Sequence, residues 1–228
     1  MKTLSIIIPV FNEFNTIQAI IEKILNYEIF HYEIIVIDDY STDGTRRVLQ
    51  DQLRDKIDYL ILNNKNYGKG FSIRQGIKKA TGDIIIIQDA DLEYDPCDYE
   101  KLIRPIIQDK ADVVFGSRFI GSDSKRVLFF WHSIGNKLLT FLSNMLSNLN
   151  LTDMECGYKV FKSHVIKNLE LKENRFGIEP EITAKVSKKF RLFEVGISYN
   201  GRSYAEGKKI TWRDGFSAIR CIILYNLL

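Results

Sequence analysis

The chain has 228 residues, of which 45% are hydrophobic, and a formal net charge of +3 at pH 7. This length and composition fit one globular domain with a substantial core, and the small net charge argues against nucleic acid as the main partner. Cys97, Cys156 and Cys221 show neither paired nor metal-ligand spacing, which is typical of a reducing compartment. We therefore expect one domain that spans residues 1–228.

The chain contains no run of about 18 apolar residues, so we expect no membrane-spanning helix. The apolar run at residues 4–10 is interrupted by Pro9 and is too short for a signal peptide. We expect a cytoplasmic protein. Peripheral contact with the cytoplasmic face of a membrane is the alternative that stays open.

The first half of the chain alternates short apolar runs with helical patterns. A helix capped by Asn15 is predicted by apolar residues at every third or fourth position from Ile17 to Leu25. The expected strands are 4–10, 33–39, 58–62, 82–87 and 112–116, and further helices are expected at 45–53, 71–80 and 98–108. We expect an α/β fold with a Rossmann-like, mostly parallel mixed sheet flanked by helices.

The second half is less regular. Residues 127–151 are rich in Leu, Phe and Trp, and their helical spacing predicts one apolar face. Packing in the core and contact with a membrane interface are both open for this face. Strands are expected at 157–161 and 192–199, helices at 180–189 and 216–228, and a charged loop at 204–214.

Acidic side chains lie at the ends of two expected strands: the second strand ends in Asp38 and Asp39, and Asp89 and Asp91 follow the fourth. Ligands of open α/β sheets bind beyond the carboxyl ends of strands, and an Asp-x-Asp pair suits Mg²⁺ or Mn²⁺ that also contacts phosphate. A solvated acidic turn before a helix at Pro96 is the structural alternative. Glycine fingerprints of dinucleotide and Walker sites are absent, so a metal ion and cationic side chains would hold phosphates.

Several segments, in order, resemble family 2 glycosyltransferases of GT-A fold. They are IPVFNE at 8–13, VIDDYSTDGT at 36–45, NYGKG at 66–70, ATGD at 80–83, DAD at 89–91 and GSRF at 116–119. The dolichyl-phosphate mannose, or polyprenyl-phosphate hexose, synthase branch is the most similar. DMECGYK at 153–159, EPE at 179–181 and the loop 202–209 extend the resemblance into the second half.

The resemblance implies a site for a nucleotide sugar of the GDP-mannose or UDP-glucose type. The implied donor-binding residues are Pro9, Phe11, Glu13, Asp38, Asp39, Lys69, Asp89 and Ala90. Asp89, Asp91 and Glu93 are the implied ligands of Mg²⁺ or Mn²⁺, and Glu93 stands where the branch often has Gln. The implied catalytic residues are Asp89, Asp91, Arg118 and Arg202, and the implied acceptor-phosphate contacts are Arg118, Arg202 and Lys209.

The implied reaction is metal-dependent, inverting transfer of a hexose to a polyprenyl or dolichyl phosphate. A phosphate monoester is largely dianionic at neutral pH, so its oxygen can attack without a protein base. If the acceptor is instead a hydroxyl group, the candidate bases are Asp153, Glu155, Glu179 and Glu181. Two alternatives stay open: a family 2 enzyme that extends a cell-surface polysaccharide or glycan, and a nucleotide-sugar-binding module without turnover.

Overall fold

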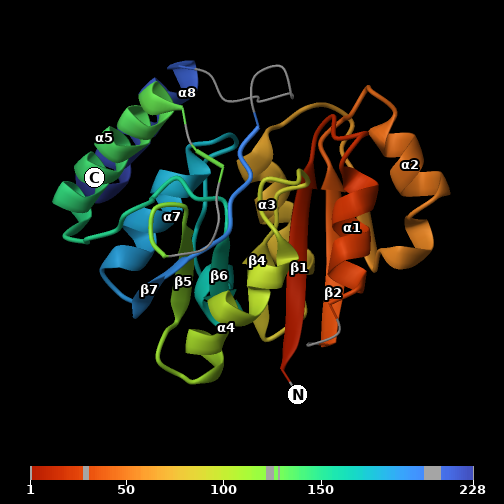
Figure 1. Ribbon diagram of the computed structural model, residues 1–228, viewed down its shortest axis with the longest axis horizontal. Helices are drawn as coiled ribbons and strands as arrows, with labels where there is room; N and C mark the ends of the chain where they lie inside the picture. Colours follow the sequence, from red (N-terminus) through yellow and green to blue (C-terminus); the bar gives the residue numbers. More distant parts are fainter. Residues whose placement is uncertain (1, 28–30, 122–125, 128, 203–211, 228) are drawn as a thin grey trace.

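A computed structural model describes residues 2–27, 31–121, 126–127, 129–202 and 212–227. In this part of the chain, a seven-stranded sheet lies between two layers of helices (Figure 1). The strands are β1 (Thr3–Val10), β2 (His31–Asp38), β3 (Tyr59–Leu62), β4 (Ile84–Ile87), β5 (Val113–Ser117), β6 (Lys159–Lys162) and β7 (Leu192–Gly196). The α-helices are α1 (Ile17–Leu25), α2 (Thr45–Asp51), α3 (Lys69–Lys79), α4 (Tyr99–Ile107), α5 (Phe130–Ser147), α6 (Ser163–Lys167), α7 (Ile178–Ser187) and α8 (Trp212–Leu227).

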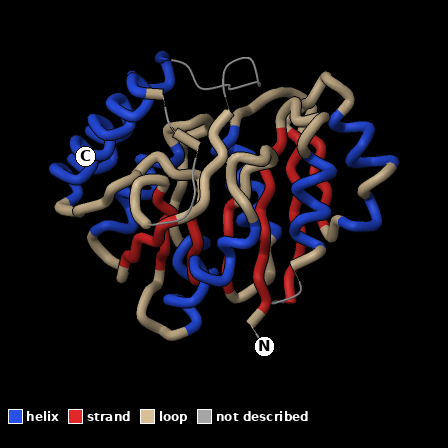
Figure 2. The backbone as a smooth tube through the Cα atoms, in the orientation of Figure 1, coloured by secondary structure: helices blue, strands red, loops and turns tan. Residues whose placement is uncertain are grey.

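The strand order is β3-β2-β1-β4-β6-β5-β7. Within the described sheet, β6 runs antiparallel to its neighbours β4 and β5, and the other pairs are parallel. The expected mostly parallel mixed sheet is therefore confirmed. Figure 2 shows the strands in the middle of the molecule with helices on either side of them.

The central strands are apolar because both faces of the sheet are covered. Ile6 and Ile8 of β1 pack in the core that contains α1, α2 and α4, whereas Ile7 packs in the opposite core with α3 and α7. The four residues of β4, Ile84–Ile87, are all isoleucine and all buried. Continuous apolar runs of this kind are typical of parallel strands buried on both faces.

The chain reverses its direction of travel across the sheet at β1. It passes from β1 to β2 and β3 on one side and later returns to β4 on the other side of β1. The carboxyl ends of β1 and β4 therefore meet at a topological switch point, the usual position of ligands in open α/β sheets. Phe11 and Asp89 follow these two strand ends.

Some local expectations differ from the structure. Asn15 does not cap α1: the helix begins at Ile17 after Thr16, and the carbonyl oxygen of Glu13 accepts hydrogen bonds from the Thr16 and Ile17 amides at 3.1 and 2.9 Å. Because the main chain performs this capping, the Glu13 side chain is available for other contacts. Helix α8 begins at Trp212, earlier than expected, and the short helix α6 was not expected at all.

Gly76 of α3 allows this helix to lie directly on the sheet. A Cβ atom at Gly76 would overlap Cγ2 of Ile7, whereas nothing lies within 4 Å of a Cβ added at Gly135 of α5. Both substitutions gain the same helix propensity. We expect Gly76→Ala to lower the free energy of unfolding by about 1–3 kcal/mol through overpacking, and Gly135→Ala to raise it by up to about 1 kcal/mol. Urea denaturation followed by circular dichroism checks both, and equal effects would contradict the packing argument.

Candidate active site

A cavity of about 780 Å³ lies beyond the carboxyl ends of β1 and β4. Most of the residues expected at the donor, metal and catalytic sites line it. They are Pro9, Phe11, Glu13, Asp39, Lys69, Asp89, Ala90, Asp91, Glu93, Arg118 and Arg202. Asp38 is not among the lining residues, and Lys209 lies outside the described residues. The structure thus brings segments that are far apart in the sequence to one cavity.

Asp38 and Asp39 have different surroundings although they are neighbours in the chain. Asp38 is fully buried and accepts a hydrogen bond from Nε of Arg46 at 2.7 Å. Asp39 lines the cavity and accepts hydrogen bonds from Nδ2 of Asn63 at 2.8 Å and from the amide of Gly68 at 2.6 Å. Asp38 is thus buried against Arg46 and is not among the residues that line the cavity, so its expected contact with the donor stays a prediction.

The loop that Asp39 holds depends on glycine. Gly68 has φ +101°, and a Cβ there would overlap the carbonyl oxygen of Asn174. Glycine permits both this backbone conformation and the close approach of the second loop, whose Asn174 carbonyl accepts a hydrogen bond from the Phe71 amide at 3.1 Å. The contact places Lys69 and Arg175 in the same wall of the cavity.

Asp89 lies between a lysine and a glycine. Its Oδ1 is 2.7 Å from Nζ of Lys69, which also lies 3.3 Å from Oε1 of Glu179. Glu179 in turn forms an ion pair with the buried Lys159. A Cβ at Gly157 would overlap Oδ2 of Asp89, so this position has no room for a side chain. The acids at this side of the cavity are therefore held in place by two lysines.

Arg202 lies among three acids. Its guanidinium is 2.6 Å from Oδ2 of Asp91 and 3.1 Å from Oε2 of Glu13, and its amide donates to Oε1 of Glu93 at 2.9 Å. The other oxygen of Glu93 accepts a hydrogen bond from the Tyr199 hydroxyl at 2.9 Å. Both Glu93 oxygens thus contact protein groups, as Asp91 contacts Arg202 and Asp89 contacts Lys69. The grouping of Glu93 with Asp89 and Asp91 as metal ligands stays a prediction.

The electrostatics at Asp91 favour a cation. Burial and the charges of Asp89 and Glu93 raise the pKa of Asp91 to about 7. Among the described residues, no three His, Cys, Asp or Glu side chains form a group that could hold a metal ion by themselves. Mg²⁺ in proteins commonly uses one or two carboxylates together with substrate phosphates. Asp89 and Asp91, two hard oxygen donors that line the cavity, fit such an ion.

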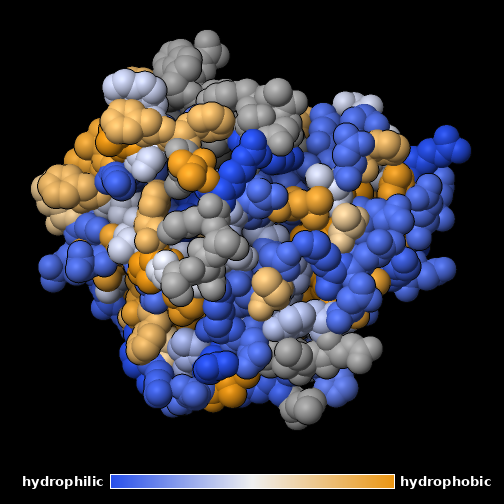
Figure 3. Space-filling view, viewed as in Figure 1, coloured by the Kyte–Doolittle hydropathy of each residue, from blue (hydrophilic) through white to orange (hydrophobic). Residues whose placement is uncertain are grey.

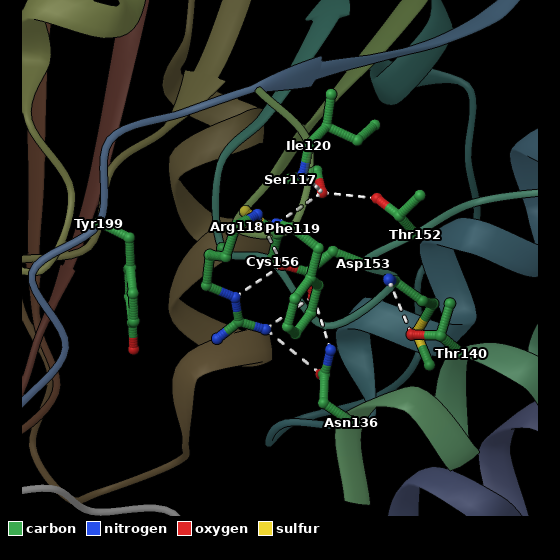
Figure 4. Close-up of polar contacts among 12 residues, drawn as sticks. Ser117, Arg118, Phe119, Ile120, Asn136, Thr140, Thr152, Asp153, Cys156 and Tyr199 are labelled. Carbon is green, nitrogen blue, oxygen red and sulfur yellow. Dashed lines mark hydrogen bonds and ion pairs between the residues drawn. The ribbon is translucent and has the colours of Figure 1, made fainter. Parts of the chain in front are cut away.

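Arg118 lies at the end of β5 and is held by the polar contacts in Figure 4. Its Nε and Nη2 contact the two carboxylate oxygens of Asp153 at 2.7 Å each, and Nη2 also donates to Oδ1 of Asn136 at 3.2 Å. The guanidinium carbon lies 5.4 Å from the centre of the Tyr199 ring. Asn136 belongs to α5, so this network ties that helix to the edge of the sheet.

Of the four candidate bases, two line the cavity and two do not. Asp153 is paired with Arg118, and Glu181 is buried, where it accepts a hydrogen bond from the Lys172 amide at 2.8 Å. Neither of these two acids lines the cavity, whereas Glu155 and Glu179 do. Of the latter pair, Glu179 is bound to lysines. Glu155 therefore differs from the other three acids, since it lines the cavity and has no hydrogen bond or ion pair to any described residue.

Sequence reasoning missed one wall of the cavity. Trp131, Asn136 and Leu139 of α5 line it, as do Arg175 and Phe176 from the loop before α7. The apolar spacing of residues 127–151 predicted the helix but gave no indication of where it packs. No local motif marked Arg175. Only the tertiary structure brings these residues to the site.

The model of the glycosyl transferase family 2 matches residues 5–169, well over half of the chain. The chain belongs to glycosyl transferase family 2. This family 2 glycosyltransferase is 26% identical over 213 residues to undecaprenyl-phosphate 4-deoxy-4-formamido-L-arabinose transferase of Aeromonas hydrophila, covering 91% of this chain and 63% of that protein. It is 29% identical over 212 residues to dolichol-phosphate mannosyltransferase of Pyrococcus furiosus, covering 90% and 60%. The chain thus spans less than two thirds of the length of these relatives.

A solved structure has the same fold as this chain. It is glucosyl-3-phosphoglycerate synthase from Mycobacterium tuberculosis in complex with Mn²⁺, uridine diphosphate and glucosyl-3-phosphoglycerate. The TM-score is 0.77 at 16% sequence identity, and the match covers 99% of this chain and 80% of that chain. Together with the mixed seven-stranded sheet, this likeness confirms the expected GT-A fold.

Helix α5 of the glycosyltransferase exposes a large apolar surface. Phe130, Trp131 and Phe141 are 66%, 79% and 63% exposed, and Phe216 of the adjacent α8 is 67% exposed. Figure 3 shows hydrophobic side chains gathered on this side of the molecule, where Figure 1 places α5 and α8 next to each other. Core packing therefore explains only part of the apolar character of residues 127–151. No helix within the described residues could cross a membrane by its length and hydropathy.

The surroundings of Glu155 predict a pH-dependent stability. Burial and the charge of Glu179 raise the pKa of Glu155 from 4.5 to about 7. Between these values the folded protein retains a proton that the unfolded chain has lost, so this group lowers the free energy of unfolding as the pH rises through the window. We expect the free energy of unfolding of Glu155→Gln, relative to that of the wild type, to be higher at about pH 8 than at about pH 5. Urea denaturation at both pH values measures this, and a constant difference would contradict it.

Proposed function

We propose that this family 2 glycosyltransferase moves a hexose from a nucleotide sugar of the GDP-mannose or UDP-glucose type to a polyprenyl phosphate, with inversion at the anomeric carbon. The names of two relatives, an undecaprenyl-phosphate transferase and a dolichol-phosphate mannosyltransferase, support this class of acceptor. The acids Asp89 and Asp91 at the switch point support a nucleotide-sugar donor.

The observation that carries the proposal is the shared wall between the cavity and the exposed apolar helix. Trp131 lines the cavity and is 79% exposed, while Leu138 and Phe141 continue the apolar surface along α5. A polyprenyl phosphate has a charged head and a long apolar tail. Its phosphate would lie in the polar cavity while its tail follows α5, which buries apolar surface that a free sugar acceptor would leave in water.

A divalent cation, Mg²⁺ or Mn²⁺, belongs to the proposal. The Mycobacterium tuberculosis structure of the same fold contains Mn²⁺ together with uridine diphosphate. In this chain Asp89 and Asp91 would hold the ion, with the donor phosphates as its further ligands. When bound, the ion would offset negative charge on the departing nucleoside diphosphate.

The cationic side chains would orient the two phosphate-bearing substrates. Arg118 presents a planar guanidinium at the cavity wall, a geometry that matches phosphate oxygens. Arg202 also lines the cavity, where it contacts Glu13, Asp91 and Glu93, and it would turn toward a phosphate by exchanging one of these acids. We assign Arg118 and Arg202, with Lys209 from the adjacent segment, to the acceptor phosphate. The acceptor oxygen is already deprotonated, so alignment and charge stabilisation are the contributions of the protein.

The proposal predicts lipid-linked transfer that depends on Asp91. With labelled donor, Mn²⁺ and polyprenyl phosphate, label should enter a butanol-extractable, mild-acid-labile product. Asp91→Asn should lower the rate at least ~100-fold, since it removes charge from the cation site while keeping the side-chain shape. Asp51→Asn, an exposed change on α2, serves as the control and should retain wild-type rate.

Other outcomes would overturn parts of the proposal. Label in a water-soluble glycan, with none in lipid, would replace the polyprenyl phosphate by a saccharide acceptor. Full activity of Asp91→Asn, or wild-type activity in excess chelator, would remove the metal assignment. Tight nucleotide binding without transfer or donor hydrolysis would indicate a binding module rather than an enzyme.

Peripheral membrane contact through α5 is a further part of the proposal. Phe130 and Phe141 are each more than 60% exposed on this helix. We expect Phe130→Ser combined with Phe141→Ser to weaken binding to phosphatidylglycerol vesicles ~10-fold or more, because two large apolar side chains no longer enter the lipid. Ile107→Ser, at the end of α4, is the control for an exposed apolar residue elsewhere. Cosedimentation measures the affinities, and equal binding of all three proteins would exclude α5 as the contact.

A further inference from the structure

Glu155 stands out among the acids that line the cavity. Every other lining acid has a hydrogen bond or an ion pair: Arg202 holds Glu13, Asp91 and Glu93, and Lys69 is bound to Asp89. Glu155 has neither with any described residue, and its Oε1 is buried without a hydrogen-bond partner. A buried carboxylate oxygen without a partner is costly, so such groups are commonly completed by a ligand or another bound molecule.

The position of Glu155 lies between the two regions assigned to phosphates. The carbonyl oxygens of Met154 and Cys156, which flank Glu155 in the chain, accept hydrogen bonds from Nζ of Lys159, and Lys159 pairs with Glu179. Asp153, two residues before Glu155, pairs with Arg118. The first pair is linked through Lys69 to Asp89, in the donor part of the cavity. The second pair belongs to the acceptor part. A sugar that passes from the donor phosphate to the acceptor phosphate must occupy the space between these parts.

We propose that Glu155 binds hydroxyl groups of the sugar that is transferred and thereby selects neutral sugars over sugars that carry a carboxylate. This proposal rests on the proposed function and deepens it by naming the class of sugar. A sugar hydroxyl donates a hydrogen bond to a carboxylate oxygen, which completes the unpartnered Oε1. A uronic acid places a second negative charge in the same low-dielectric region, and like charges there repel.

A role as general base is the competing assignment. A base takes a proton from an acceptor hydroxyl during the chemical step, so its loss lowers kcat and leaves donor affinity unchanged. A residue that binds the sugar contributes before the chemical step. Its loss therefore weakens binding of the nucleotide sugar but leaves the affinity for the free nucleoside diphosphate unchanged.

The test compares each nucleotide with its sugar-bearing form by calorimetry, with Mn²⁺ and at about pH 8. The probes are UDP, UDP-glucose and UDP-glucuronate, with GDP and GDP-mannose as a second pair. In the wild type, the preferred nucleotide sugar should bind more tightly than its nucleoside diphosphate. Glu155→Ala should reduce this gain ~10-fold or more, the size expected for a lost hydrogen bond to a charged group, with nucleoside diphosphate affinity unchanged.

Glu155→Gln provides the second variant, because an amide keeps the shape and one acceptor oxygen but carries no charge. It should retain part of the gain from the sugar and should bind UDP-glucuronate at least ~10-fold more tightly than the wild type does. Thermal denaturation of both variants verifies that they fold.

The outcomes separate this inference from the proposed function. If the wild type binds neither UDP-glucose nor GDP-mannose, the proposed function and this inference both fail. If it binds one of them and the gain from the sugar is the same in wild type, Glu155→Ala and Glu155→Gln, this inference alone is overturned. A fall in kcat for lipid-linked transfer with unchanged nucleotide-sugar affinity would instead assign Glu155 as a base.

Discussion

Carboxylates crowded into one cavity repel one another, and the arrangement of this site depends on the cations that separate them. Arg202 bridges Glu13, Asp91 and Glu93, and Lys69 bridges Asp89 to an acid of α7. Each cation comes from a segment far in sequence from the acids it contacts. Ion pairs of this kind therefore do more than balance charge, because they draw the segment after β7 and the start of α3 to the ends of β1 and β4.

The same charge balance constrains how a substrate enters. The proposed donor, with its diphosphate, would bring further negative charge into a cavity that is already rich in acids, so its binding would need cations that are available for exchange. The guanidinium of Arg202 is partly exposed and contacts several oxygens at once, which allows it to give up one contact and keep the others. Arg118 is more firmly held, because Asp153 binds it through both carboxylate oxygens. Arg202 can thus exchange its partners, whereas Arg118 stays bound to Asp153.

Local patterns explain how much of this site could be predicted. The run Ile84–Ile87 and the acids after it form one uninterrupted pattern, and the structure places Asp89 and Asp91 at the cavity as expected. The partners of the acids could not be predicted, since Arg46 and Arg202 reach them through the tertiary fold. Local sequence patterns could not predict the antiparallel direction of β6 either. Because β6 is antiparallel, the residues that precede it, including Glu155, arrive at the edge where other strands contribute the residues that follow them.

Helix α5 carries its exposed aromatic surface and its link to Arg118 on one rigid element. Asn136 donates to Asp153 at 2.9 Å and accepts from Arg118, two turns or less along the helix from Phe130 and Trp131. An occupant that shifts α5 must therefore also shift the groups that orient the guanidinium. If the proposed attachment at the apolar surface and the proposed phosphate binding in the cavity both shift α5, the two events are linked through this helix, and their coupling acts equally in both directions.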